Sequence, residues 1–525
     1  AVKVVASPAK FEALVAQERY QRAIAASAVS PVDAFHWELE FPEVFLSPAR
    51  TQAGRVGFDA IIGNPPYDVL AEKELTAGRP CAEAAVMRRH FAAIKKFIES
   101  VPHYEPSRRG KNNLYKLFIC RALDLLTTGG RLGFIVPMDL LGGDGTVGVR
   151  KAILKAGAFT AIEAFPQKDE ATQRVFPEAK QSTAIFVMIR TDTPTQRTTP
   201  FLIRQHAAAT IDAGSPSLQL RVDDIALYDE HNLSLASCSQ EDWDLAVRIM
   251  GSGRLLRMNR VATSFQGEVN ETTDREKGTI SYDPKDGPEV IRGAHVCQYH
   301  IRPASQGRDV FVIPTRFLAG KQPASKAYHH GVARVGFQRK SPQNNFRRLI
   351  ACPVPAGKFL LESVSYVPKT QCTLPLEVLL ALLNGHLCEW YFRLGSTNAM
   401  VNEYQFDNLP CPVFSPHESS ADHDGVFRNA LEAIKLEHFA DAFRALKPLL
   451  EQPPFSRVIQ SVLVELVQRI LRAEKARGTI ARSGRSALGP AAQPFQDLID
   501  RIIYAMAGLS DVEARGLEDR LARML

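Results

Sequence analysis

Apolar and polar positions follow two different periods over the first 200 residues. Apolar residues at helical spacing fill 8–29, 113–126 and 149–157. Apolar runs and alternations typical of strands fill 36–45, 59–62, 131–137, 159–165 and 182–190. Strands that alternate with helices predict an α/β fold, in which a mostly parallel sheet carries helices on both faces.

The alternation of strand-like and helix-like segments ends at residues 191–200, which are rich in Thr and Pro. The pattern of apolar residues changes twice more after that. Short strand-like runs with many basic residues begin near 236, whereas 424–477 and 493–525 are strongly helical. We therefore expect a partial Rossmann-like sheet, a mixed α/β domain and a C-terminal helical segment. The expected boundaries are 1–57 for a helical connecting segment, 58–200 for a catalytic domain, 201–235 for a linker, 236–414 for the mixed domain and 415–525 for the helical region.

Composition narrows the class of protein only a little. The chain has 525 residues, of which 45% are hydrophobic and 23% charged, and a net charge of +7, as in ordinary globular proteins. Its eight cysteines form no CxxC pair, which disfavours a zinc cluster or a disulfide framework and favours a reducing, cytoplasmic location. There is no apolar run of 18 residues, so we expect no membrane contact. The start without Met inside a helical pattern suggests a fragment or a processed form.

The stretch GFDAIIGNPPYDVL, residues 57–70, runs from an apolar strand into two prolines. Prolines donate no backbone hydrogen bond, so carbonyls here stay free to accept one, and Asn64 adds a side-chain carbonyl. Two acceptors at the carboxyl end of a strand suit an exocyclic NH2 group, and Tyr67 offers a flat ring to a base lifted out of a duplex. Taken alone, the four residues 64–67 would also suit a rigid turn with a packed tyrosine.

The surrounding sequence favours the reactive interpretation. GFDAIIGNPPY resembles motif IV of adenine-N6 DNA methyltransferases, and it follows HWELEFPEVF as in type IIG restriction–modification and phage-defence enzymes. NLYKLFICRALDLLTTGGRLGFIVP (113–137) resembles motifs V and VI, and RVFPEAKQSTAIFV (174–187) resembles motif VIII. Residues 36–190 thus resemble the gamma class of these enzymes. The resemblance implies site-specific methyl transfer from S-adenosylmethionine to adenine N6 in double-stranded DNA.

The resemblance also implies roles for single residues. Asn64 and the Pro65 carbonyl would accept hydrogen bonds from the adenine amine. Tyr67 would stack on the flipped base, and Phe176 would pack on it from another side. Phe118, together with Pro65, would lie near the adenine ring of the methyl donor. The implied catalytic set is Asn64, Pro65, Pro66 and Tyr67.

The methyl-donor half of the resemblance is incomplete. The family carries a Gly-rich DxxxGxG loop before motif IV, whereas residues 1–57 contain only Gly54 and Gly57. We therefore expect that this chain lacks the N-terminal S-adenosylmethionine-binding motif I, and that an upstream segment or a partner chain supplies it. Residues 143–148 satisfy GxGxxG with Glu163 as a following acid, but MDLLG separates them from the strand, which disfavours a dinucleotide site.

Residues 310–361 contain no Asp or Glu and nine basic residues, with aromatic and amide side chains between them. Such a tract suits phosphate contact, although it would also suit a solvated loop. VIRGAHVCQYHI (290–301) and LEVLLALLNGHLCEWYFRLGS (376–396) resemble the target-recognition domain of the same enzymes, which favours DNA. The expected DNA-binding residues are Arg316, Lys321, Lys326, Arg334, Arg339, Lys340, Arg347 and Arg348.

Two functional hypotheses remain open from the sequence. The first is an adenine-N6 DNA methyltransferase in a restriction–modification or phage-defence system. The second is a DNA-binding specificity subunit, whose catalytic half is inactive without a partner or an upstream segment. The histidines show no trusted metal-ligand spacing, and no PD…(D/E)xK-like cluster indicates a nuclease, so we expect no metal site.

Overall fold

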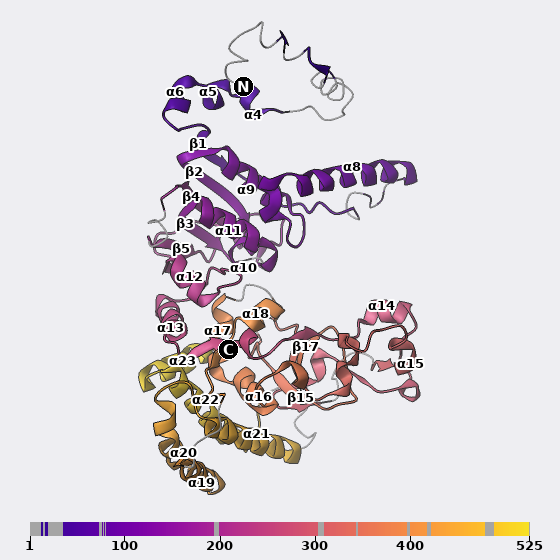
Figure 1. Cartoon of the computed structure of the whole chain (residues 1–525), viewed down its shortest axis with the longest axis vertical. Helices are drawn as coiled ribbons and strands as arrows, with labels where there is room; N and C mark the ends of the chain where they lie inside the picture. Colours follow the sequence, from indigo (N-terminus) through magenta and orange to yellow (C-terminus); the bar gives the residue numbers. More distant parts are fainter. Residues whose placement is uncertain are drawn as a thin grey trace. The chain divides into compact units, whose positions relative to one another are not determined.

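The computed structural model describes residues 12–13, 16–18, 21, 35–72, 76, 78, 80–167, 169–193, 199–302, 309–342, 345–395, 399–416, 422–477 and 488–523. The helix expected over 8–29 lies largely outside these residues. The chain divides into two compact units, each described by itself (Figure 1). The first unit comprises Ala1–Leu140 and Gly145–Ser215, and the second comprises Leu141–Asp144 and Pro216–Leu525.

A mixed sheet forms the centre of the first unit, with its strands in the order β1-β2-β4-β3-β5. β1 runs parallel to β2 and β3 parallel to β5, whereas β4 is antiparallel to both β2 and β3. The prediction of a mostly parallel sheet was therefore wrong. Among its described residues, the segment between β3 and β4 contains only one short 3-10 helix, Ala171–Gln173, and β4 returns antiparallel beside β3. The strands are β1 (Phe58–Gly63), β2 (Leu126–Pro137), β3 (Gly157–Phe165), β4 (Thr183–Arg190) and β5 (Phe201–Gln205).

The pairing of β5 with β3 brings residues 201–205 into the sheet, where the sequence predicted a linker. Helices that pack beside the sheet include α9 and α11, whose expected positions are confirmed to within two residues. The helices of this unit are α4 (Trp37–Glu40), α5 (Pro42–Phe45), α6 (Pro48–Gln52), α8 (Cys81–Ser100), α9 (Leu114–Leu125) and α11 (Val147–Ala156).

The prediction of a strand over 36–45 was also wrong, because α4 and α5 occupy it. Trp37, Phe41 and Phe45 follow one another at intervals of four, which is helical spacing, and Pro42 starts the second helix. The apolar residues at 37, 39 and 41 fit the two-residue period of a strand, and those at 37 and 41 also fit the spacing of a helix. The helical spacing prevails.

The second unit begins with strand- and loop-rich structure and ends in helices. Its largest sheet has the order β15-β14-β17-β8, and two clusters of buried apolar residues lie within this part. Its longer strands are β6 (Ser217–Leu220), β14 (Arg334–Gln338), β15 (Ala351–Val354) and β17 (Val364–Pro368). The α-helices that precede the C-terminal segment are α12 (Val222–Tyr228), α13 (Gln240–Gly251), α14 (Glu271–Glu276), α15 (Pro314–Phe317), α16 (Leu376–Asn384), α17 (His386–Gly395) and α18 (Glu403–Asp407).

The strands of two or three residues in this unit are β7 (Leu255–Arg257), β8 (Phe265–Gln266), β9 (Ile280–Ser281), β10 (Val290–Ile291), β11 (Val296–Cys297), β12 (His300–Ile301), β13 (Phe311–Val312), β16 (Phe359–Leu360) and β18 (Pro410–Pro412). Several of them pair with strands that are distant in sequence, as β10 does with β16 and β7 does with β18. The mixed α/β character expected for 236–414 is confirmed.

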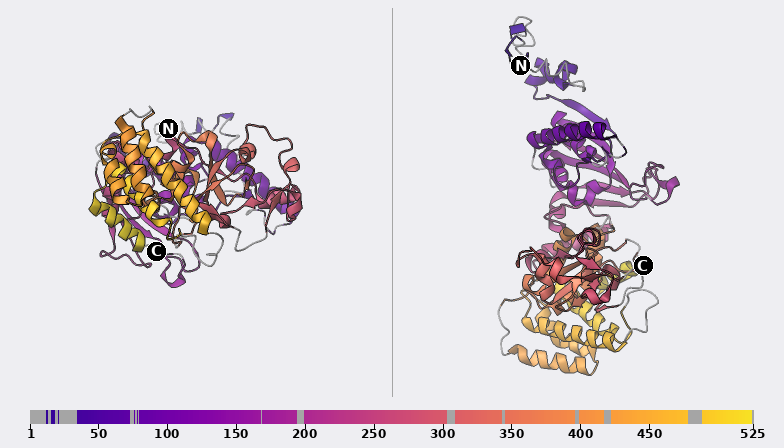
Figure 2. Two further views of the ribbon diagram at one scale, coloured as in Figure 1. Left: turned by 90° about the horizontal axis from the view of Figure 1, so that it is seen from below. Right: turned by 90° about the vertical axis from the view of Figure 1, so that its right-hand side faces the viewer.

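The C-terminal helical segment is also confirmed. Its helices α19 to α22 pack against one another, as the orange and yellow ribbons in both views of Figure 2 show. The helices of the whole segment are α19 (Asp422–Lys435), α20 (Phe439–Leu446), α21 (Arg457–Arg477), α22 (Gln493–Ala507) and α23 (Asp511–Arg523). Among the described residues, no helix combines the length and apolarity needed to cross a membrane.

Candidate active site

Residues 64–67 leave the sheet at the carboxyl end of β1. The ladder with β2 ends at Gly63, opposite Phe134, and a Cβ at Gly63 would lie 3.3 Å from that ring. Asn64 follows directly and is exposed, and its amide forms no hydrogen bond within the described part of the chain. Pro65 is buried and Pro66 is exposed. Asn64 therefore presents free acceptor and donor groups at the end of a strand where α/β proteins bind ligands.

The segment after the prolines is held against the start of α9. The backbone N–H of Leu114 donates to the Asp68 carbonyl over 2.9 Å, and that of Leu70 donates to the Asn112 carbonyl over 2.8 Å. These bonds fix the chain on both sides of Val69, so the backbone that carries Tyr67 has a defined position. A freely mobile turn is excluded for this segment.

Tyr67 and Phe176, the two residues that the resemblance assigned to the target base, have neighbouring rings. Their ring centroids are 6.0 Å apart at an angle of 79°, and Tyr67 meets Tyr115 on α9 at 6.4 Å and 79°. The Tyr67 hydroxyl is buried without a hydrogen-bond partner among the described residues, and burial raises the pKa of Tyr67 to about 12. Packing of the ring, and not a hydroxyl hydrogen bond, therefore positions Tyr67.

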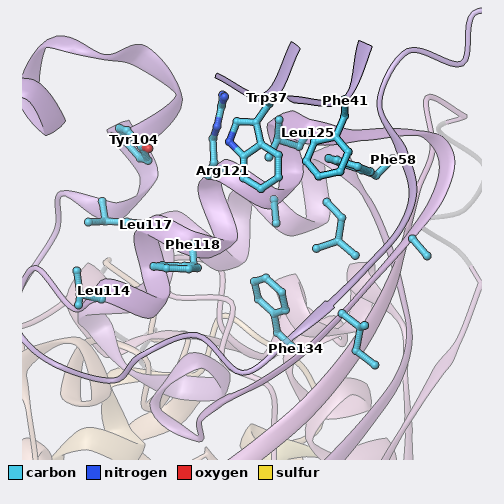
Figure 3. A pocket seen from close by; sticks show the side chains of 14 residues that line it. Trp37, Phe41, Phe58, Tyr104, Leu114, Leu117, Phe118, Arg121, Leu125 and Phe134 are labelled. Atoms are coloured by element: carbon cyan, nitrogen blue, oxygen red, sulfur yellow. The ribbon is translucent and has the colours of Figure 1, made fainter. Parts of the chain in front are cut away.

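An apolar cavity of about 660 Å³ lies beside β1, between that strand, α9 and the N-terminal helices (Figure 3). Phe118 is 47% exposed and lies on this cavity. Among its lining residues only Arg121 carries a formal charge. The other lining residues are Trp37, Phe41, Phe58, Ala60, Ile61, Ile62, Tyr104, Leu114, Leu117, Ala122, Leu125 and Phe134.

The aromatic wall of this cavity was not predicted. Trp37 and Phe41 stack at 5.9 Å and 20°, and both meet Phe58 nearly edge-on. The spacing of four between Trp37 and Phe41 was the signal that could have identified this wall, because it places both rings on one helical face. The mistaken strand prediction concealed it.

β1 is an edge strand in the described sheet. It pairs with β2 alone, and Ile62 on it is 92% exposed. Burial of an isoleucine side chain is worth about 1.5–3 kcal/mol, so this exposure forgoes a sizeable stabilisation. Residues 60–63 also lack the charges and prolines that protect open edges from pairing.

The described residues do not fit the whole of S-adenosylmethionine. That molecule carries a carboxylate, an ammonium group, a sulfonium and ribose hydroxyls, which require polar partners. The cavity beside Phe118 offers mainly apolar side chains and one arginine. It could contact the adenine ring, but it does not supply a cradle for the charged end.

The glycines of the GxGxxG match serve packing. A Cβ at Gly148 would lie 2.3 Å from the Pro106 carbonyl oxygen, and Lys116 donates to the Gly145 carbonyl over 3.1 Å. Glu163 is bound by Arg204 at 2.6 Å and by His206 at 2.8 Å. The loop and the acid are therefore committed to internal contacts, which argues against a dinucleotide site.

Three of the expected DNA-binding arginines are interior residues, and for them the prediction was wrong. Arg334 is 1% exposed, donates to Glu268 over 2.9 Å, and lies over the Tyr366 ring. Loss of one partner from such a buried pair costs about 3–5 kcal/mol, so Arg334 has a structural role.

Arg347 and Arg348 are likewise enclosed in the second unit. Arg347 donates to the carbonyls of Leu349 and Gly385, each over 2.8 Å. Arg348 is 2% exposed and lies over the Phe392 ring, and burial lowers its pKa to about 10. Neither side chain is available to a phosphate.

The other five expected DNA-binding residues reach the surface. Arg316, Lys326 and Lys340 are exposed, and Lys321 and Arg339 are partly exposed. Buried Arg334 pairs with Glu268, which lies far from it in the sequence. The absence of acids from residues 310–361 therefore did not indicate which of its basic residues form internal ion pairs.

One group in the second unit has the spacing of a metal site. Ligand atoms of Glu289, His295 and Asp309 lie within 4.8 Å of one another. However, Nδ1 of His295 accepts a hydrogen bond from the Arg292 backbone N–H at 3.1 Å, which leaves the proton of a neutral ring on Nε2, facing Glu289. A metal ligand would need that nitrogen deprotonated, so this arrangement favours a histidine–carboxylate contact.

Several solved structures show remote similarity to this chain. Solved structures with similarity include the type IIL restriction–modification enzyme MmeI in complex with DNA, at 10% identity over 89% of this chain and 57% of that one, with a TM-score of 0.41. The type IIG restriction endonuclease BpuSI gives 11% identity over 85% and 54% of the chains, with a TM-score of 0.27. This chain spans about half the length of each of those two proteins.

A putative class I S-adenosylmethionine-dependent methyltransferase from Listeria monocytogenes gives 18% identity over 30% and 38% of the chains, with a TM-score of 0.20. At such TM-scores these similarities carry no argument about function. Residues 9–171 match the family model described as Eco57I restriction-modification methylase. Over this range, the match confirms the resemblance to restriction–modification methylases.

Proposed function

We propose that this chain binds the target base in a site-specific adenine-N6 DNA methyltransferase of a restriction–modification or phage-defence system. The observation that carries the proposal is Asn64, exposed and unbonded among the described residues, at the carboxyl end of β1 with Tyr67 and Phe176 beside it. The match of residues 9–171 to restriction–modification methylases supports it.

The chemistry follows from the amine of the base. The Asn64 side-chain carbonyl and the Pro65 carbonyl accept hydrogen bonds from the two N6 hydrogens and hold the amine in place. These bonds oppose conjugation of the nitrogen lone pair with the purine, so the lone pair can point toward an electrophilic methyl group. Catalysis in this half-site is orientation and electrostatic stabilisation, and the methylated nitrogen afterwards loses its proton to water.

The base also requires room beside Tyr67. The edge-on contact with Phe176 leaves no space for a flat base between the two rings. We therefore propose that the base stacks on a face of Tyr67 and that Phe176, on the 174–187 segment, moves to cover it. Phe176 is partly exposed, which fits such a movement.

The cofactor of the complete enzyme is proposed to be S-adenosylmethionine, which supplies the methyl group when bound. Phe118 and Pro65 would lie on the adenine side of that cofactor. The polar cradle would come from a further segment or partner chain, whose strand adds to the free edge of β1. The unpaired edge, the exposed Ile62 and the apolar cavity support this addition.

The runner-up is a DNA-binding specificity subunit without catalysis of its own. The incomplete fit to S-adenosylmethionine favours it for the isolated chain. The two proposals differ in the role of Asn64. A subunit that only recognises DNA does not require Asn64 to accept a hydrogen bond from the adenine amine.

Substitution of Asn64 separates them. Asn64→Ala should lower methyl transfer to DNA by the complete enzyme at least about 100-fold, the effect of removing one electrostatic contact from a transition state. Asn64→Asp is the matched control, because it keeps an acceptor oxygen and should retain more activity. Asn64 is exposed, so the free energy of unfolding should change by under about 0.5 kcal/mol. Equal activity of wild type and Asn64→Ala would exclude the proposed role.

A further inference from the structure

A small polar cavity lies within the second unit, where side chains of α17, α22 and α23 meet the segments around residues 298 and 347. Its volume is about 210 Å³. Sites that hold drug-sized ligands measure roughly 300–1,000 Å³, so a ligand of this cavity would be smaller than those. We call it the α17–α22 cavity.

Arg347, which lines this cavity, is a buried cation without an ion pair. The residue is 7% exposed, and its Nε and Nη2 donate to the carbonyls of Leu349 and Gly385, each over 2.8 Å. Within the described part of the chain, its Nη1 forms no hydrogen bond and its guanidinium contacts no carboxylate at ion-pair distance. A buried charge is costly unless it is paired, so Nη1 at the cavity would be stabilised by an anion.

Glu389 also lines the cavity, but its carboxylate is already bound on both oxygens. One oxygen accepts from the Arg348 backbone N–H over 2.8 Å and from the Arg393 Nε over 2.6 Å. The other oxygen accepts from the Leu349 backbone N–H over 2.7 Å. Arg347 and Arg393 against Glu389 leave the lining with a formal charge of +1 when its histidine is neutral.

Asp500 is a further acid in this region, and it too is engaged. One of its oxygens accepts from the His386 backbone N–H over 2.8 Å, and the other accepts from the Gln496 amide over 3.1 Å. Asp500 forms no ion pair with Arg347. The positive charge of Arg347 is therefore compensated only by two backbone carbonyls among the described residues.

Two neutral polar groups border the same cavity without using their hydrogen-bonding capacity. Gln298 is 6% exposed, and its side-chain amide forms no hydrogen bond with any residue that the structure describes. His386 lines the cavity as well, and its Nε2 has no partner in the same part of the chain. Buried polar groups without partners destabilise a fold, so these groups indicate a polar ligand and not an apolar one.

The remaining wall offers apolar contact. Phe346, Leu488 and Leu521 line the cavity together with the polar groups. A ligand that fits both kinds of wall has a charged or polar end and a small hydrocarbon part.

We propose that the α17–α22 cavity binds a small organic monocarboxylate. Its carboxylate accepts a hydrogen bond from Nη1 of Arg347, Gln298 is a further donor, and its carbon part packs on the apolar wall. The single negative charge matches the lining charge of +1, whereas a dianion would leave one charge unpaired. The cavity is too small for the backbone of a duplex, so Arg347 stays closed to DNA phosphates. The inference goes beyond the proposed function and does not depend on it.

The test is calorimetric titration of the whole chain with sodium benzoate, and with benzamide as the neutral probe of the same shape. Charge-assisted hydrogen bonds are about twice as strong as neutral ones, so the dissociation constant of benzoate should be at least about tenfold lower than that of benzamide.

Two substitutions locate the binding. Arg347→Met should raise the dissociation constant of benzoate at least about tenfold, and Gln298→Met should raise it about threefold, as expected for one neutral hydrogen bond. Arg428→Met is the matched control, because Arg428 is an exposed arginine on α19, away from the lining, and benzoate binding should not change.

Thermal unfolding shows whether each variant is folded. Arg347→Met removes the donor of two carbonyls, so Gln298→Met, which breaks no side-chain hydrogen bond, decides the matter if Arg347→Met does not fold. Absence of benzoate binding to wild type, equal affinity for benzoate and benzamide, or unchanged benzoate binding in the folded variants would overturn the proposal. Displacement of benzoate by inorganic phosphate at lower concentration than by acetate would assign the cavity to another class of anion.

Discussion

The two sides of β1 differ sharply in how completely they are built. At its carboxyl end, residues 64–70 are held by backbone bonds to the start of α9 and by rings packed around Tyr67. Along its free edge, the same strand exposes Ile62 and borders an apolar cavity with one charged residue. The candidate site is therefore well ordered at the carboxyl end of β1, whereas the free edge of the same strand is unpaired.

This difference has a physical basis. The carboxyl end is formed from contacts inside the first unit, so folding of that unit is sufficient to fix it. The free edge of β1 has no pairing strand in the described sheet, and the proposed strand addition would cover it. The proposed base-binding side should thus be sensitive to single substitutions, while the edge should be sensitive to the strand that pairs with it.

The largest expected effect in this comparison belongs to Tyr67. Tyr67→Ala should reduce methyl transfer by the complete enzyme about 10- to 100-fold, since stacking of a base on an aromatic ring is worth about 1–3 kcal/mol. Steady-state kinetics with a duplex substrate would measure the loss.

Tyr67→Phe is the informative partner of that variant. The Tyr67 hydroxyl has no hydrogen-bond partner in the described structure, so its removal should leave activity within about threefold of wild type. If Tyr67→Phe were as damaging as Tyr67→Ala, the hydroxyl and not the ring face would be the working group.

The free edge gives a prediction of a different kind, which concerns the exchange of backbone amides and requires no substitution. In the chain alone, the β1 amides that face the edge should exchange with solvent at least about 100-fold faster than those of β2, which is bonded on both sides. Hydrogen exchange followed by mass spectrometry would resolve the two strands. Slow exchange throughout β1 would mean that another part of the chain already covers the edge, and the proposed strand addition would then be wrong.

The sequence predicted best those elements whose structure depends on residues adjacent in the chain. β1, α9, β2 and the turn at residues 64–67 follow from local period and proline chemistry, and they lie within a few residues of their predicted places. Tyr67 and Phe176 lie on two segments that the resemblance assigned to the same base, and their rings are neighbours. Phe118 lies on a cavity, although that cavity fits a cofactor only in part.

Features set by distant residues could not be predicted in this way. The insertion of β4 between β2 and β3 is decided by the pairing of β4 with β2, whose residues are distant in the sequence. The burial of Arg334 depends on Glu268, and the engagement of the Arg348 backbone depends on Glu389. A local count of charges does not include those partners, so an acid-free tract was mistaken for a wholly exposed one.

The central claim is that this chain holds the base side of the reaction and does not complete the donor side. An equilibrium titration of the chain alone with S-adenosylmethionine, followed by the midpoint of thermal unfolding, tests it most directly. A ligand at 100 times its dissociation constant stabilises a protein by about 2.7 kcal/mol, so binding would be plain to see. We predict no shift for the chain alone and a shift once the segment that pairs with β1 is added. A saturable shift with the chain alone would contradict the account.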